Sequence, residues 1–272
     1  PVYEADKVIG IGTVKPHQIA GWSGGAKCIQ PGVCGKETTE KTHWVFANIP
    51  KSLIIGNVDA QPRKEMERVA QQVGLDFVIN VVLDRNKELS YICSGDFIEA
   101  HRNCVHFASP FFTMGFSQQA DIVICGSGTW ASNLWLAGGT ASYADLFMKN
   151  GGTLIILASC PEGLDPEHPV IGEYGFRSYE EIAELVKQGK ITDLVGATQM
   201  TQLGNMMFKR DIECILVSKG ISEELAAKLN LTYAKSPQDA IEIALRKHGT
   251  NGITIYAMPG RVPGGVLPKS TE

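Results

Sequence analysis

The second half of this 272-residue chain alternates short apolar runs with longer amphipathic segments. The apolar runs, each predicted to form a strand, are residues 120–125, 152–159, 212–217 and 252–258. Strands that are apolar along their whole length are typical of parallel sheets, because helices cover both faces of such sheets. Helices are predicted at residues 132–150, 178–188, 191–208, 222–229 and 236–248. This alternation predicts an α/β fold with a parallel C-terminal sheet.

The first half has a less regular pattern, in which a glycine-rich loop interrupts the strands. Strands are predicted at residues 8–14 and 52–58, and a hairpin at residues 76–83 and 88–93. Helices are predicted at residues 37–47, 62–73 and 96–108. The pattern changes near residues 112–119, so we expect two domains, residues 1–115 and 116–272.

Composition excludes several classes of protein. Hydrophobic residues make up 44% of the chain and the net charge is −4, which excludes wholesale disorder and a global basic field for nucleic acid. No apolar run approaches the roughly 18 residues of a membrane span, and no signal peptide is recognisable. The seven cysteines include no C-x-x-C pair and read as reduced thiols, which predicts a cytoplasmic protein.

Most of the residues that could take part in catalysis or ligand binding lie in one stretch. Residues 15–27 read KPHQIAGWSGGAK. The glycines of this stretch, Gly24 and Gly25 among them, allow backbone N–H groups to cradle an anion such as phosphate. A desolvated Lys27 becomes a nucleophile or an attachment point. His17 and His43 flank this lysine and are candidates for acid–base catalysis or metal binding. On residue types alone, a chain-turning loop with a solvated lysine and two structural histidines explains the pattern as well.

Longer motifs decide between these interpretations. Residues 10–43 read GIGTVKPHQIAGWSGGAKCIQPGVCGKETTEKTH, and residues 56–84 and 94–101 continue with GNVDAQPRKEMERVAQQVGLDFVINVVLD and SGDFIEAH. These strings resemble the nickel-dependent lactate racemase family, strongly over about residues 5–130 and more loosely beyond. The spacing of nine residues between His17 and Lys27, and of fifteen between Lys27 and His43, is the most specific part of the resemblance.

The resemblance implies an isomerase that inverts the hydroxyl-bearing carbon of 2-hydroxy acids. Its cofactor would be a nickel pincer, pyridinium-3,5-bisthiocarboxylic acid mononucleotide, which takes a hydride from the substrate and returns it to the opposite face. Lys27 matches the lysine that holds this cofactor covalently, His43 matches the nickel ligand, and His17 matches one of two proton-transferring histidines. Gly24, Gly25 and Trp22 are expected at the cofactor; core packing is the alternative for Trp22.

Two departures from the family pattern matter. The family's second catalytic histidine and an arginine-bearing motif lie upstream of the matched region, so the chain looks like a member whose N-terminal part is missing or is a separate chain. Residues 135–140, WLAGGT, carry no cation or amide where lactate-specific relatives grip the carboxylate. We therefore expect a 2-hydroxy acid other than lactate.

Two alternatives stay open. The chain is either an enzyme or an incomplete cofactor-binding fragment that needs the upstream segment. A third reading, an NAD-dependent oxidoreductase, rests only on residues 10–12 and 126–128, GIG and GSG, which fall short of a full dinucleotide motif. The remaining histidines are expected to be structural or solvated: His101, His106, His168 and His248. Arg261 is a weak candidate for an anion contact.

Overall fold

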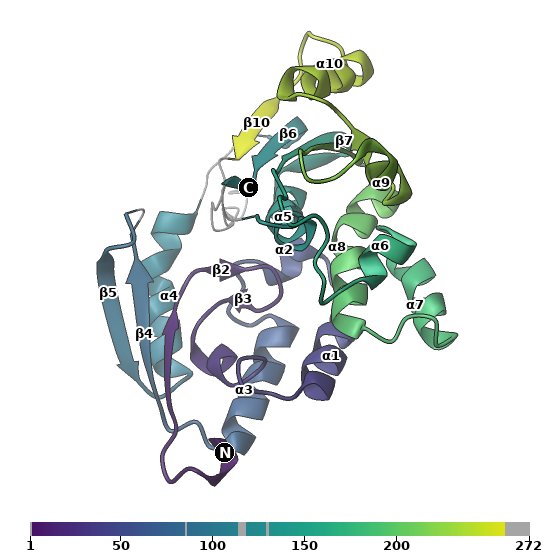
Figure 1. The fold of residues 1–272 in the computed structure, drawn as a ribbon. Coiled ribbons are helices and arrows are strands. Elements are labelled where there is room, and N and C mark those ends of the chain that lie inside the picture. The colour runs from purple at the N-terminus through teal and green to yellow at the C-terminus, as the bar shows by residue number, and fades with distance from the viewer. Residues whose placement is uncertain (1, 85, 114–117, 129–130, 259–272) are drawn as a thin grey trace. The chain divides into compact units, whose positions relative to one another are not determined.

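The computed structural model describes residues 2–84, 86–113, 118–128 and 131–258 (Figure 1). They form two compact units, which divide between residues 115 and 116. The residues 112–119 of the expected boundary lie partly outside the described residues, as does Arg261. All seven cysteines are unpaired, and none of the described helices has the length and apolarity needed to cross a bilayer.

Unit 1 contains a three-stranded sheet, a two-stranded hairpin and several helices. Its strands are β1 (Ile9–Thr13), β2 (Pro16–His17), β3 (Gly21–Trp22), β4 (Phe77–Leu83) and β5 (Leu89–Gly95). Its helices are η1 (Val2–Glu4), η2 (Gly25–Cys28), α1 (Lys36–Val45), α2 (Lys51–Ile54), α3 (Gln61–Val73) and α4 (Glu99–Phe112). The order of the sheet is β1-β4-β5, with β1 and β4 parallel and β4 and β5 antiparallel.

The core of unit 1 lies on one face of this sheet. Along β4 the side chains of Val78, Asn80 and Val82 are at most 1% exposed, and they alternate with partly exposed neighbours. Helix α4 packs against β4 and β5 on the buried face, while η2 packs against β1 and α3 packs against η2. The alternation along β4 therefore directs one face to the core and leaves the glycine-rich loop between the sheet and α3.

Unit 2 is built around a five-stranded, fully parallel sheet of order β10-β6-β7-β8-β9. Its strands are β6 (Ala120–Gly126), β7 (Met148–Leu157), β8 (Glu213–Val217), β9 (Thr232–Tyr233) and β10 (Ile255–Met258). Its helices are α5 (Leu134–Ala141), η4 (Ser142–Leu146), α6 (Val170–Tyr174), α7 (Tyr179–Lys187), α8 (Leu194–Lys209), α9 (Glu223–Lys228) and α10 (Pro237–His248). The predicted α/β fold with a parallel C-terminal sheet is confirmed.

Two predicted elements are wrong. Residues 52–58 were expected to be a strand, but α2 occupies residues 51–54 and the chain turns at Gly56, whose φ is +75°. A run of three apolar residues, Leu53 to Ile55, suits either a helix or a strand, so local periodicity does not decide between them. The helix expected over residues 132–150 ends at Ala141, and β7 already begins at Met148, where it pairs with Ala120.

Candidate functional site

The glycine-rich loop leaves β1 and immediately folds into the small β2–β3 hairpin, in which His17 pairs with Gly21. Trp22 fixes the returning strand, because it is completely buried and its indole N–H donates to the carbonyl oxygen of Gly56 at 2.7 Å. Its ring also meets Phe112 edge-on, with 6.0 Å between ring centroids. Trp22 thus packs in the core behind the loop and offers no exposed surface to a ligand.

Arg63, on α3, binds the glycine-rich loop through hydrogen bonds to its backbone carbonyls. It is completely buried, and its guanidinium donates to the carbonyl oxygens of Ala20 and Gly24 at 3.2 and 3.1 Å and also to that of Trp22. Burial lowers the pKa of Arg63 to about 10, which still leaves it charged at neutral pH. One buried cation therefore fixes the conformation of residues 20–24 through three carbonyls.

Gly24 and Gly25 allow the loop backbone to pack closely against neighbouring side chains. Their φ angles are +77° and +56°, and a Cβ on Gly25 would lie 3.0 Å from the ring of His101. The N–H of Gly25 donates to Oδ1 of buried Asn80 at 2.9 Å. Arg63 occupies the Gly24 carbonyl. These glycines therefore let the loop approach β4 and α4, and the Gly25 N–H is already engaged within the protein.

His17 is half-buried at the mouth of the hairpin. Its Nδ1 accepts hydrogen bonds from the backbone N–H groups of Ile19 and Ala20, at 3.1 and 3.2 Å. A ring nitrogen that accepts carries no proton, so the neutral imidazole keeps its proton on Nε2. Burial, followed by the charges of Lys27 and Arg63, lowers the pKa of His17 well below its ordinary value. In this conformation His17 is a neutral donor through Nε2–H.

His43, in the last turn of α1, has the opposite tautomer. Its Nδ1 lies 2.7 Å from the carbonyl oxygen of Thr39, which can only accept, so Nδ1 carries the proton and Nε2 presents a lone pair. Burial lowers the pKa of His43, and the charges of Lys27 and Lys51 act in the same direction. A neutral imidazole that donates its other N–H to a backbone carbonyl is the usual arrangement of a histidine metal ligand.

Lys27 lies on η2, between these two histidines in sequence, and is partly buried. Burial lowers the pKa of its ammonium group, and the charge of Arg63 lowers it further, while the neighbouring Cys28 acts in the opposite direction. A lysine with a lowered pKa supplies a neutral amine more readily and is a better nucleophile.

His17, Lys27 and His43 lie on three different elements, β2, η2 and α1, and their charges act on one another. The charges of Lys27 and His43 both lower the pKa of His17, and the charge of Lys27 also acts on His43. Lys15 adds a further positive charge that acts on both His17 and Lys27. The site is electropositive, which suits an anionic ligand.

Protein ligands alone do not define a metal centre here. Among the residues that the structure describes, no group of three or more His, Cys, Asp or Glu side chains is placed to hold a metal ion.

Sequence reasoning missed Arg63, because a charged side chain in a helix is ordinarily solvated. The other histidine beside the loop, His101, is structural: its Nε2–H donates to the Ser23 carbonyl at 2.9 Å, and its Nδ1 lies 3.1 Å from an Arg102 nitrogen. Burial lowers its pKa to about 3, so it stays neutral. His106 is exposed on α4.

Comparison with known proteins finds that the chain resembles proteins of one class, the lactate racemases. Residues 1–56 match the model of the lactate racemase N-terminal domain. Lactate racemases from Lactiplantibacillus plantarum and Thermoanaerobacterium thermosaccharolyticum are 28% and 26% identical to it over 253 and 252 residues, which is 90% and 89% of this chain. The chain is therefore similar to lactate racemases over most of its own length. It spans only 58% and 57% of the length of these two relatives.

Solved structures agree in fold. The lactate racemase apoprotein from T. thermosaccharolyticum superimposes with a TM-score of 0.83 at 24% identity, covering 98% of this chain and 64% of that one. A Thermotoga maritima protein superimposes with a TM-score of 0.75 at 21% identity, covering 98% of this chain and 68% of that one. At these identities the likeness establishes the α/β fold alone.

Proposed function

We propose that this chain carries the cofactor site of a nickel-dependent racemase or epimerase of 2-hydroxy acids. Two observations together carry the proposal. The partly buried Lys27 has a lowered pKa, and the hydrogen bond from Nδ1 of His43 to Thr39 leaves a lone pair on Nε2 of His43. An amine ready to form a covalent bond and an imidazole ready to bind a metal lie in one electropositive site.

These residues fit the cofactor that the family resemblance implies, a nickel-bearing pyridinium-3,5-bisthiocarboxylic acid mononucleotide. Lys27 would hold it covalently, Nε2 of His43 would bind its nickel, and Lys15 and Lys51 would balance its negative charge. When bound, this group supplies a hydride acceptor at the substrate carbon. The protein supplies position, charge and proton transfer around it.

His17 would handle the proton of the substrate hydroxyl. As folded, it can donate a hydrogen bond from Nε2 to a substrate oxygen, because Nδ1 is held by the N–H groups of Ile19 and Ala20. To accept a proton at Nε2, the ring must move its own proton to Nδ1 and give up those two bonds. Removal of the hydroxyl proton at Nε2 and its later return therefore both require the Nδ1–H tautomer, and as folded His17 only donates a hydrogen bond to the substrate oxygen.

The substrate proposed is a 2-hydroxy acid other than lactate. Residues 135–140, which lack a cation, lie on α5 and its end. There the Trp135 ring stacks on His168, with 4.1 Å between centroids, and the Trp135 carbonyl accepts from Gln199 at 3.0 Å. The segment is thus occupied by contacts within unit 2.

The deciding experiment is co-expression with the enzymes that make the cofactor, followed by mass spectrometry. We expect a mass adduct on the peptide that contains Lys27 and about one nickel per chain. Lys27→Arg should abolish the adduct, whereas the matched variant Lys15→Arg should keep it. His43→Ala should keep the adduct and lose the nickel measured by elemental analysis. An unmodified Lys27 in nickel-loaded protein contradicts the assignment.

A second candidate is a cofactor-binding part that turns over no substrate by itself. It is favoured by the proposed role of His17, which serves one face of a carbon whose inversion needs proton transfer on both. In that case the loaded chain shows no loss of optical rotation with any of a panel of 2-hydroxy acids. Adding the missing segment restores it, and His17→Ala then abolishes it.

The NAD-dependent alternative finds little support in the loop after β1. Gly10 and Gly12 lie within β1, and a Cβ on Gly12 would come 3.2 Å from both Cys28 Sγ and the Cα of Gly24. These glycines therefore admit η2 against the strand rather than a dinucleotide.

A further inference from the structure

Helix α1, which carries His43, has little apolar packing to hold it in unit 1. None of its ten residues is buried, and Lys36 and Val45 at its two ends are exposed. Because helices in proteins owe most of their stability to a packed apolar face, the position of such a helix depends on a few specific contacts. The hydrogen bond between His43 and Thr39 lies within α1, so it orients the imidazole on the helix but does not position the helix itself.

One contact of this kind joins α1 to the segment that carries Lys27. Gln30 lies just after η2, and its backbone N–H donates to the carbonyl oxygen of Ala26 at 3.1 Å. Its side-chain Nε2 donates to Oγ1 of Thr42, the residue before His43, at 2.5 Å. Two consecutive hydrogen bonds therefore connect the backbone around Lys27 to the turn of α1 that carries His43.

The burial of the Gln30 amide is costly. The residue is 0% exposed, and no group among the residues that the structure describes donates to its Oε1. A buried acceptor without a donor costs more than one neutral hydrogen bond returns. A methionine, which has a similar length, would remove this cost, and the hydroxyl of Thr42 would keep its own acceptor, the carbonyl oxygen of Thr38 at 2.7 Å. The stability of unit 1 therefore gives no reason for an amide at position 30.

We propose that Gln30 is a positioning residue, whose hydrogen bond to Thr42 sets the place of the His43 imidazole relative to the Lys27 amine. The proposal rests on the proposed function in giving these two groups a common ligand. A ligand that is bonded covalently at one residue and through its metal at another requires a fixed separation between them. Gln30 acts through Thr42 and the backbone of α1, not on the ligand itself.

A purely structural role for Gln30 makes the opposite prediction. If the amide stabilised the fold, Gln30→Met would lower the free energy of unfolding of unit 1 as a whole. If the amide positions α1, the same substitution leaves that free energy unchanged or raises it, while residues 36–45 open more readily by themselves. The two roles are therefore separated by measuring local and global opening in one variant.

The first measurement uses the chain without cofactor and compares Gln30→Met with Thr42→Val. Each removes the same hydrogen bond with little change of shape, so each should speed hydrogen exchange in residues 36–45 by about three- to tenfold. The double variant should exchange no faster than either single variant, because the bond can be lost only once. Urea unfolding should find Gln30→Met at least as stable as the unchanged chain.

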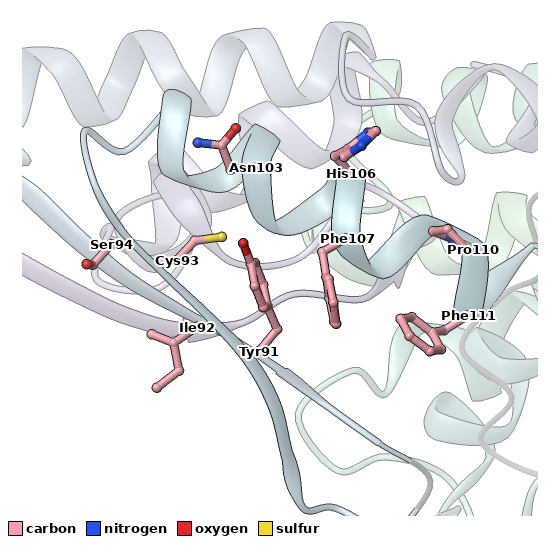
Figure 2. Close-up of a pocket in the computed structure, with 9 residues that line it drawn as sticks. All are labelled: Tyr91, Ile92, Cys93, Ser94, Asn103, His106, Phe107, Pro110 and Phe111. Atoms are coloured by element: carbon pink, nitrogen blue, oxygen red, sulfur yellow. The ribbon is translucent and has the colours of Figure 1, made fainter.

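Three control variants should leave exchange in residues 36–45 as it is in the unchanged chain. Thr38→Val makes the same change as Thr42→Val at an exposed position of α1. Thr42→Ser keeps the hydroxyl to which Gln30 donates. Asn103→Leu removes an amide from α4, where Asn103 lines the cavity beside β5 (Figure 2). Together they separate loss of the Gln30–Thr42 bond from the general effects of substitution.

The second measurement uses chain that has been co-expressed with the enzymes that make the cofactor. Gln30→Met should keep the adduct on Lys27 but release nickel to a chelator about three- to tenfold faster than the unchanged chain. Unchanged exchange in residues 36–45 overturns the proposal, as does a lower stability of all of unit 1. Faster exchange with an unchanged rate of nickel release overturns it as well. An unchanged chain that carries no nickel contradicts the proposed function instead, and exchange in the empty chain then decides alone whether Gln30 positions α1.

Discussion

The two sheets of this protein differ in how fully they are covered. In unit 2, three consecutive residues of β7, Leu154, Ile155 and Ile156, are at most 1% exposed, so both faces are packed. In unit 1, Ile9 and Ile11 of β1 are mostly exposed while the glycines between and after them face η2. The unit with the complete core holds few of the predicted site residues, and the unit with the candidate site has an uncovered face.

The difference shows that unit 1 is held together by other means than a two-sided apolar core. Its glycine-rich loop depends on polar groups that are buried for that purpose. Arg63, Asn80 and His101 each bond to backbone atoms of residues 20–25. Such contacts position a loop accurately, but they are costly to lose, because a buried polar group without a partner is strongly destabilising.

The largest effect is expected from Arg63→Ala. The substitution leaves the carbonyls of Ala20, Trp22 and Gly24 without their donor and opens a cavity, which should cost unit 1 about 3–5 kcal/mol. Hydrogen exchange read by mass spectrometry should show residues of unit 1 opening readily while β7 keeps its protection. Arg68→Ala, on the exposed side of the same helix, should cost under about 0.5 kcal/mol. Equal loss of protection in both units would break the comparison.

The fold was more predictable than the site. Apolar runs such as residues 120–125 and 212–217 predict parallel strands, because strands that are buried on both faces carry few polar residues. The short run at residues 52–58 could not be decided locally, because its helix depends on Pro50 and on Lys51, whose Nζ reaches the Gln18 carbonyl at 3.2 Å. Local periodicity does not reveal a contact between residues that are far apart in the sequence.

The tautomers of His17 and His43 also could not be predicted from the sequence. Motifs identified His17 and His43 as a pair, yet one accepts at Nδ1 and the other donates there, because different backbone groups face them. Arg63 was hidden for a similar reason. An arginine in an amphipathic helix usually reaches solvent, and only the folded loop supplies the carbonyls that pay for its burial.

A smaller effect separates equivalent isoleucines in the two sheets. Ile155→Ala in β7 removes a side chain that is 1% exposed and should cost about 3 kcal/mol. Ile11→Ala in β1, at 71% exposed, should change the stability of the isolated chain by less than about 0.5 kcal/mol. Urea unfolding of both variants measures the contrast. A large cost at Ile11 would mean that the exposed face of the unit 1 sheet is already covered.

The smallest effect is a pH dependence of opposite sign in the two units. Burial holds the folded pKa of His101 near 3, below its unfolded value, so the unfolded chain binds the extra proton. The stability that neutral His101 contributes is present above about pH 6.5 and is lost as the pH falls toward 3. At pH 5 unit 1 should have lost about 2 kcal/mol from this residue. His17, whose pKa is also lowered, acts in the same direction.

His168 in unit 2 behaves in the opposite way. Burial acts to lower its pKa, but the hydrogen bond and charge of Asp193, with the charges of Asp165 and Glu167, raise it above the ordinary value. Its contribution is therefore present below about pH 6.5 and is lost as the pH rises through the folded pKa. Pulse proteolysis in urea at pH 5, 6, 7 and 8, with fragments assigned to each unit, should show unit 1 weakening on acidification without a matching loss in unit 2. His101→Gln keeps a donor for the Ser23 carbonyl but cannot titrate, so it should flatten the dependence of unit 1; an unchanged slope in this variant would move the effect to other groups.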